Sequence, residues 1–210
     1  MNSILSARAF VLAFFAIAVA LRLVPHEYNL TAIGALGLFA GYYWSATAGL
    51  LFSMAAMAVS DMVGHWLQIP SMGVYDIRIM LPVYLAMGAS GLIGRALAMP
   101  GRKRRLPLWL VVPGGAAAAS LAFFLISNFA VWIGPYSTYP RNVAGLVECY
   151  VAAIPFIKNT ILGNFLFSAI FFGSYAAAGQ WLGSHAGAHN AELRPASHNL
   201  ARTSKSSADE

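Results

Sequence analysis

Long apolar runs, separated by short polar stretches, are the feature that most limits how this 210-residue chain can fold. The clearest runs cover residues 5–24, 46–63, 79–98 and 108–131. A helix of about 20 apolar residues crosses the hydrocarbon core of a bilayer. Charged residues make up 10% of the chain, against about 25% in an average soluble domain. The sequence therefore predicts an all-α integral membrane protein.

We expect about six transmembrane helices, although two of the apolar stretches are short. Residues 32–43 predict a tilted or partly re-entrant helix. Residues 145–156 either pack as a half-helix or lid, or extend into the final run at 160–182. The first run, residues 5–24, is interpreted as a span; a cleaved signal peptide is the alternative, because Arg8 precedes an apolar core.

Charge and composition predict the orientation and the domain limits. Residues 1–183 form the expected membrane domain, and residues 184–210, rich in Ser, Ala, His and Asn, form an expected disordered cytoplasmic tail. Lys and Arg in short loops favour the cytoplasmic side, and residues 102–105 carry four of them. With six spans, both termini are then cytoplasmic. This cluster lies beside a span, so we interpret the net charge of +6 as a topology signal, with membrane lipid and not nucleic acid as the partner.

Most of the remaining ionisable residues fall on the outer side of this topology, which predicts an outward-facing polar pocket. Asp61 and His65 lie four residues apart, so a structural ion pair or hydrogen bond, a ligand contact and a metal pair all remain open. Asp76 and Arg78 are either interfacial anchors or ligand contacts. The side chains that we expect to bind a substrate are His26, Tyr28, Asn29, Asp61, His65, Tyr75, Asp76, Arg78, Asn128, Trp132 and Asn159. We expect Asp61, His65, Asp76 and Arg78 to converge on one cavity.

Aromatic and amide side chains complete this hypothesis. Tyr28, Trp66, Tyr75 and Trp132 are the expected stacking walls. The amides of Asn128, Asn159 and Asn164 lie in apolar runs, where they suit either bridges between helices or hydrogen bonds to a solute.

Catalytic and nucleotide-binding motifs are absent from the sequence. It contains no Gly-x-Ser-x-Gly, no Gly-rich phosphate loop with Lys and no His-Glu-x-x-His. The single cysteine, Cys149, matches no metal-binding spacing. We therefore expect no enzyme activity, no cofactor, no metal site and no ATP-driven motor within this chain.

Four segments resemble one family of membrane proteins. They are residues 22–29 (RLVPHEYN), 32–39 (AIGALGLF), 127–132 (SNFAVW) and 149–156 (CYVAAIPF). Asn159, Thr160 and Gly163 follow the last of them. Over roughly residues 8 to 180, the chain resembles a family of uncharacterised bacterial membrane proteins regarded as transport proteins. That family is similar to the substrate-binding S components of energy-coupling-factor (ECF) vitamin transporters.

The resemblance implies a six-helix, ECF S-component-like bundle in the bacterial inner membrane, with a small-molecule site near the outer face. It also implies a partner transmembrane subunit coupled to ATPases. S components contact that subunit through small residues of the first helix, and Ala9, Ala13, Ala16 and Ala20 have the corresponding spacing. In an alanine-rich helix the same spacing also arises by chance. Asn164 stands where we expect an acidic residue in many relatives, which argues against a proton- or cation-linked role there.

The leading functional hypothesis is membrane transport, by a subunit that captures a small polar or heterocyclic nutrient at the outer face. The alternative is a non-transporting membrane scaffold or assembly factor that binds partner helices through glycine-rich faces. An intramembrane enzyme is a third hypothesis. A sealed outer pocket containing Asp61, His65 and Arg78 would favour transport, whereas glycine-lined grooves without a cavity would favour the scaffold.

Overall fold

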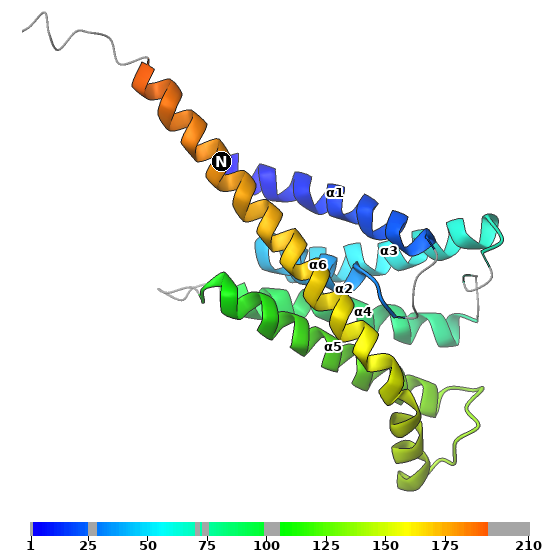
Figure 1. Cartoon of the computed structure of the whole chain (residues 1–210). Coiled ribbons are helices and arrows are strands. Elements are labelled where there is room, and N and C mark those ends of the chain that lie inside the picture. The colour runs from blue at the N-terminus through cyan, green and yellow to red at the C-terminus, as the bar shows by residue number, and fades with distance from the viewer. Residues whose placement is uncertain (1, 25–28, 70–71, 73–75, 99–105, 193–210) are drawn as a thin grey trace, which may run out of the picture. The chain divides into compact units, whose positions relative to one another are not determined.

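The described part of the chain is entirely helical, which confirms the predicted all-α class. A computed structural model describes every residue except 1, 25–28, 70–71, 73–75, 99–105 and 193–210, and gives no side chains for 2–6 and 182–192. The described residues form six α-helices and no strand (Figure 1). These are α1 (Asn2–Leu23), α2 (Ile33–Tyr43), α3 (Ala46–Trp66), α4 (Ile77–Ala98), α5 (Leu108–Ile133) and α6 (Val143–Glu192).

Four of these helices are long and apolar enough to cross a membrane: α3, α4, α5 and α6 as far as Trp181. The shorter α2 has 11 residues, about half of what a full crossing needs. Crossings by α1 and α2, and so the total of about six, stay predictions. Large apolar side chains such as Leu51, Leu121 and Leu162 are more than half exposed on the long helices, as expected for surfaces that face lipid.

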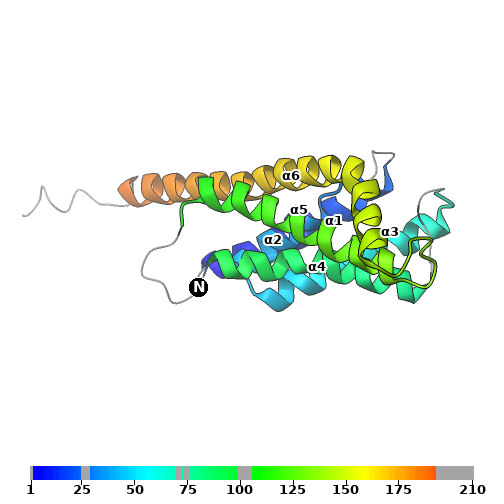
Figure 2. The same cartoon turned by 90° about the horizontal axis from the view of Figure 1, so that it is seen from below.

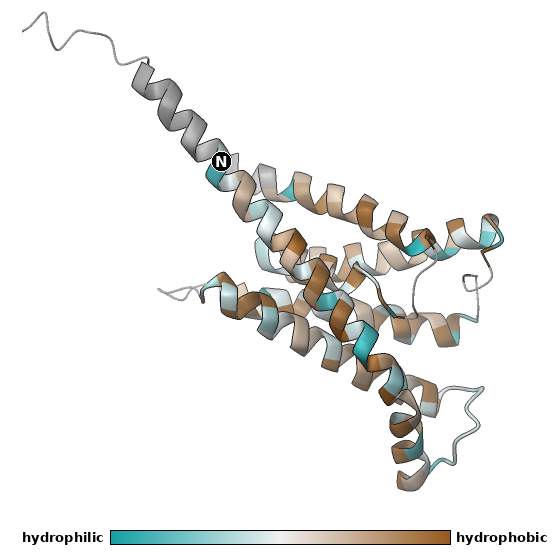
Figure 3. Ribbon diagram, in the orientation of Figure 1, coloured by the Kyte–Doolittle hydropathy of each residue, from teal (hydrophilic) through white to brown (hydrophobic). Residues whose placement is uncertain are grey.

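The distribution of hydrophilic residues also fits helices that cross a membrane. Most hydrophilic residues gather near helix ends and in loops, and a few lie within α6 (Figure 3). Polar groups far from helix ends therefore need partners inside the protein, because lipid offers none.

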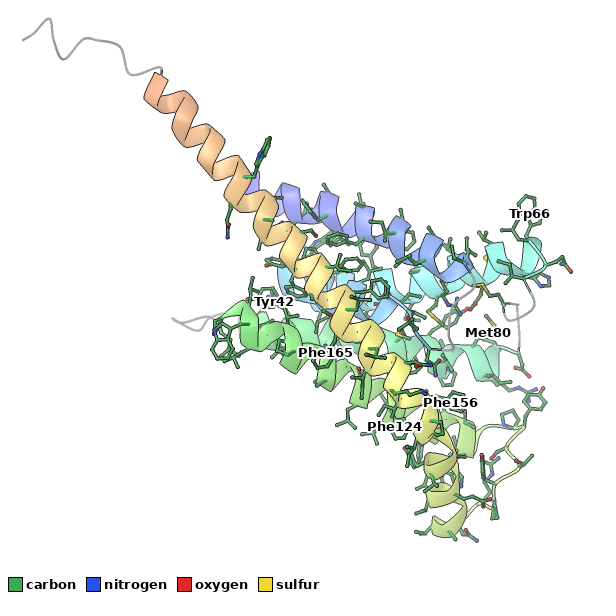
Figure 4. All side chains as sticks on the ribbon, in the orientation of Figure 1. Tyr42, Trp66, Met80, Phe124, Phe156 and Phe165 are labelled. Atoms are coloured by element: carbon green, nitrogen blue, oxygen red, sulfur yellow. The ribbon has the colours of Figure 1, made fainter. Side chains whose placement is uncertain are left out.

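The final helix differs from its predicted limits. Residues 143–192 form one helix with Pro155 inside it, so the segment 145–156 extends into the final run and is not a separate half-helix. Figure 4 shows α6 bending near Phe156, next to this proline. Proline removes one backbone hydrogen bond and kinks a helix, but membrane helices tolerate it.

The chain divides into two compact units, Met1–Gly173 and a second that begins at Ser174. Within the second unit, α6 continues to Glu192, beyond the expected end of the membrane domain at residue 183, and the disorder of the tail stays a prediction. No proline interrupts the sequence between Pro155 and Pro195, and alanine, the best helix former, is frequent there. The rest of the expected tail, residues 193–210, lies outside the described residues.

Helix α2 is the buried centre of the first unit: every residue from Ile33 to Tyr42 is buried. Glycines let its neighbours approach closely. A Cβ atom at Gly49 of α3 would lie only 2.5 Å from the Cα of Gly91 of α4, and one at Gly41 of α2 would overlap the Gly91 carbonyl. These glycines therefore bring the backbones of α2, α3 and α4 into contact.

Short polar caps separate these helices. The Ser45 side chain accepts a hydrogen bond from the Ala48 amide at 3.0 Å and so begins α3 directly after α2. The Asn142 side chain does the same for α6, accepting from the Gly145 amide at 2.9 Å. The chain reversal between α2 and α3 consequently needs only Trp44 and Ser45, whereas a longer loop precedes α6.

Successive helices of the first unit run in alternating directions, so their ends gather in two sets (Figures 1 and 2). One set joins the end of α1 to α3 through the contact of Arg22 with Asp61, and α3 to α4 through the contact of Asp61 with Tyr84. The start of α4 and the α5–α6 loop meet there as well, through Asp76 and Tyr136. We call this set the Arg22 end. The opposite set brings the start of α1 to the α2–α3 turn, where the Arg8 guanidinium lies over the Trp44 ring.

Candidate functional site

A buried ionic cluster ties three helices together at the Arg22 end. The Arg22 guanidinium of α1 donates to the Asp61 carboxylate of α3 at 2.6 Å and to the Ser60 hydroxyl at 2.6 Å. Asp61 accepts a second hydrogen bond, at 2.5 Å, from the Tyr84 hydroxyl of α4. The side chains of Arg22 and Asp61 are only 16% and 8% exposed. Each charge therefore depends on the other, since little solvent reaches them.

A second cluster of the same composition lies on the surface. The Arg78 guanidinium donates to the Asp76 carboxylate at 2.5 and 2.9 Å, and the Tyr136 hydroxyl donates to the same carboxylate at 2.9 Å. These hydrogen bonds, from Arg78 first and then from Tyr136, hold the pKa of Asp76 well below its usual range. The Arg78 side chain is 63% exposed. This cluster links the start of α4 to the α5–α6 loop.

A cavity of about 210 Å³ lies within the helices of the first unit, lined from α4, α5, α6 and the segment before α2. We call it the aromatic cavity, because Phe123, Phe124 and Phe156 line it. Figure 4 shows the last two on α5 and α6, on neighbouring parts of the bundle. Of the described residues, its polar lining consists of Asn29, Ser127, Asn128 and Thr160.

A smaller cavity of about 130 Å³ adjoins it, and the two share Val83 and Ser127. We call this one the loop cavity, because Gly134, Pro135, Tyr136 and Ser137 of the α5–α6 loop line it together with Arg78. Arg78 and Tyr136 of the surface cluster therefore line the cavity that neighbours the aromatic cavity.

The α5–α6 loop is held in place by its own side chains. The Trp132 indole nitrogen donates to the Pro140 carbonyl at 2.9 Å. The Arg141 guanidinium donates to the carbonyls of Trp132 and Gly134, at 2.6 Å for the latter. Trp132 therefore shapes the loop and does not line either cavity.

Of the residues expected to bind substrate, Asn29 and Asn128 line the aromatic cavity and Arg78 lines the loop cavity. Asn29 has a φ of 64°, in the left-handed region that asparagine tolerates better than most residues. Asn159 is half-buried but is not among the residues that line these cavities. His26, Tyr28 and Tyr75 lie outside the described residues.

The structure does not bring Asp61, His65, Asp76 and Arg78 together around one cavity. Asp61 belongs to the buried cluster, Asp76 and Arg78 belong to the surface cluster, and the His65 side chain is exposed. Shared helical register does not make Asp61 and His65 partners, because Arg22 reaches Asp61 from another helix. Trp66, an expected stacking wall, is 79% exposed and projects from the end of α3 (Figure 4).

Several residues of these sites were not predicted. Tyr84 carried no signal, since one tyrosine within an apolar run resembles many others. Phe123, Phe124 and Thr160 also escaped notice, although polar residues at 127, 128 and 160 follow aromatic residues four positions earlier at 123, 124 and 156. That repeated spacing was the available signal.

Asn164, for which two roles were open, bridges helices. Its amide nitrogen donates to the Ser120 hydroxyl at 2.9 Å, and a Cβ atom at Gly34 would overlap its side chain. Within the described part of the chain, no group of three or more His, Cys, Asp or Glu side chains is placed to hold a metal ion.

Comparison with known proteins identifies a family but no activity. No match was found among curated proteins or among solved structures. Residues 3–186 match a family model described as a family of unknown function, DUF6580. Because this match covers most of the chain and the whole helical part through α5, the protein belongs to the DUF6580 family.

Proposed function

We propose that this chain is a membrane transport protein that captures a small polar or heterocyclic nutrient, as an S-component-like subunit. The observation that carries the proposal is the aromatic cavity, in which four polar side chains and three phenylalanines from separate segments converge. Mixed aromatic and polar linings of this kind are typical of small-molecule sites. The adjoining loop cavity offers a path towards the Arg22 end.

The scaffold alternative relied on glycine-rich faces that bind partner helices. Gly37, Gly41, Gly49, Gly91 and Gly94 are all buried, and each packs against another helix of this same chain. These faces are therefore already occupied. The pocket of Asp61, His65 and Arg78 that was expected to favour transport is not formed. The aromatic cavity and the occupied glycines instead favour transport over the scaffold.

A partner subunit would supply the energy, because the sequence has no nucleotide-binding motif. Ala9, Ala13, Ala16 and Ala20 are all exposed, whereas Ala7, Val11, Phe14 and Ala18 on the same helix are buried. Such a stripe of small residues allows close approach of another helix. We assign it to the transmembrane coupling subunit, whose ATPases would drive uptake.

Retention of a small molecule by the purified protein tests the proposal. Native mass spectrometry should find a bound compound in the wild type. Ala153→Trp, which places an indole in the aromatic cavity, should abolish its retention, whereas Ala152→Trp on the exposed side of α6 should keep it. Asn128→Leu gives a second, less bulky cavity variant. Equal retention by all four proteins, or only lipid and detergent in each, would overturn the proposal.

The orientation is part of the same proposal, since a capture site must face the nutrient. We propose that the Arg22 end is outside the cell and that residues 102–105 are cytoplasmic, as the positive charges favour. In a Cys149→Ser background, a membrane-impermeant thiol reagent should label a cysteine placed at Ser137 and spare one at Lys103. The opposite labelling pattern would invert the topology.

A further inference from the structure

Three polar side chains of the aromatic cavity donate hydrogen bonds to the backbone of their own helices. Ser127 donates to the Phe123 carbonyl at 2.6 Å, Asn128 donates to the Phe124 carbonyl at 2.8 Å, and Thr160 donates to the Phe156 carbonyl at 3.5 Å. Each bond returns to the residue four positions earlier in the same helix. A hydroxyl has one hydrogen, so while these bonds are made Ser127 and Thr160 accept from a ligand and do not donate to it.

Acceptors therefore outnumber donors among the described side chains of this lining. The Asn128 amide uses one of its hydrogens on the helix, which leaves its oxygen and one N–H towards a ligand. Asn29 adds one further amide, with one acceptor oxygen and two hydrogens. A molecule that presents N–H or O–H groups would satisfy more of these atoms than one that presents only oxygen or unprotonated nitrogen.

Charge sets a second limit. Among the described residues, those that line the aromatic cavity include no Asp, Glu, Lys, Arg or His. A charged molecule would lose its hydration there without gaining a counter-charge, which is costly in a low-dielectric site. Arg78, in the adjoining loop cavity, is already paired with Asp76. Three phenylalanines instead favour a flat aromatic face.

Resting on the proposed function, we infer that the aromatic cavity selects a small, neutral, aromatic or heteroaromatic molecule that donates hydrogen bonds through N–H or O–H groups. A volume of about 210 Å³ is below the range of roughly 300–1,000 Å³ that holds drug-sized ligands. The occupant is therefore of the size of a single ring or a fused pair of rings with small substituents.

Three probes that share a benzoyl group separate the features of this inference. Benzamide is neutral and donates two hydrogen bonds, N,N-dimethylbenzamide is neutral and donates none, and benzoate is an anion. Their dissociation constants are measured by thermal stabilisation of the full-length protein in mild detergent, after removal of any co-purified ligand. Benzamide should bind about tenfold more tightly than N,N-dimethylbenzamide, because donor hydrogen bonds are lost on methylation. Benzoate should bind still more weakly.

A substitution at Asn128 should change the selectivity in a way that a structural role would not. Asn128→Asp keeps the shape and adds a negative charge, so the cation benzamidine should gain roughly tenfold to a hundredfold in affinity. Asn128→Leu should remove the preference for benzamide over N,N-dimethylbenzamide. The matched control is Asn142→Asp, because Asn142 is exposed at the start of α6 and aspartate is also a good N-cap.

The possible results of these experiments distinguish failure of the ligand class from failure of the transport proposal. Equal or tighter binding of benzoate or N,N-dimethylbenzamide would overturn the ligand class, and so would the same gain for benzamidine in Asn142→Asp. If the protein retains a charged co-purified compound that Ala153→Trp excludes, the transport proposal survives and this inference fails. If no compound is retained and no probe binds, both fail.

Discussion

Two clusters at the Arg22 end contain the same three groups, an arginine, an aspartate and a tyrosine, but in different surroundings. Arg22, Asp61 and Tyr84 come from three helices and are largely buried. In the other cluster Arg78 is 63% exposed, and Asp76 is its neighbour in sequence. Burial decides what such a cluster contributes: solvent screens an exposed ion pair, whereas a buried charge without its partner is strongly unfavourable.

The two clusters contain the same side-chain types, but the comparison implies that their roles differ. The buried cluster joins α1, α3 and α4, and it lines neither of the two cavities described above. We therefore expect it to stabilise the helical bundle. Arg78 and Tyr136 of the exposed cluster line the loop cavity. Their contribution to stability should be small, and their contribution to access larger.

The largest expected difference concerns the two aspartates. Asp61→Ala leaves the Arg22 guanidinium largely buried without a counter-charge, so the free energy of unfolding should fall by roughly 3–5 kcal/mol. Asp76→Ala should change it little, because the group is at the surface. Unfolding of both variants in mixed micelles, followed by circular dichroism, measures the two changes. A larger loss for Asp76→Ala than for Asp61→Ala would reverse the comparison.

The reason for that loss can be separated from the loss itself. Replacing both charges by apolar residues, Arg22→Met with Asp61→Leu, leaves no unpaired charge. The double variant should therefore be more stable than Asp61→Ala alone, although Tyr84 still loses its acceptor. A double variant as unstable as the single one would show that the ion pair itself, and not an orphaned charge, stabilises the bundle.

This contrast also shows how far the sequence leads. The helix limits follow from apolar runs ended by Ser45, by Pro107 and by the polar loops, so five of the six helices were expected within a few residues. The continuity of α6 was left open, because Pro155 ends a helix in water but is tolerated in apolar surroundings. The pattern of apolar runs thus predicts well where helices begin. It predicts less well whether two neighbouring runs form one continuous helix.

Contacts between helices were harder to predict. Sequence placed Arg22, Asp61, Asp76 and Arg78 on one side of the membrane but gave no means of pairing them, since either arginine has the charge that Asp61 needs. The glycine contacts of α2 with α3 and α4 decide which helices become neighbours, and so which pairs form. The cavities also depend on this packing. Asn128 was predicted because it is polar in an apolar run, and Asn29 because it ends a polar segment expected on the outer side. The phenylalanines around them look like ordinary core residues.

The two tyrosines give a smaller and more selective comparison. Tyr84→Phe removes the hydrogen bond to the buried Asp61 carboxylate, which should cost about 1.5–3 kcal/mol, the usual range for bonds to charged groups. Tyr136→Phe removes an exposed bond to Asp76 and should leave stability almost unchanged. The same unfolding measurement applies to both. Tyr136→Phe should instead speed the exchange of a bound probe through the loop cavity, and identical exchange rates in the two variants would contradict the assigned role.

The smallest expected effect is the acid titration of the exposed cluster. Because hydrogen bonds from Arg78 hold the pKa of Asp76 below its ordinary value of 3.8, the stabilisation it gives is present above that pH and is lost as pH falls through the lower folded-state pKa. Carbon-13 NMR of the labelled aspartates should therefore show no titration of Asp76 between pH 7 and pH 4. Arg78→Gln should raise its pKa towards the ordinary value, and Tyr136→Phe should raise it less, because the tyrosine contributes less than the arginine. If Asp76 titrates at its ordinary pKa in the wild type, or if Arg78→Gln leaves that pKa unchanged, then the two residues are not paired in solution, and the exposed cluster does not hold the α5–α6 loop over the loop cavity.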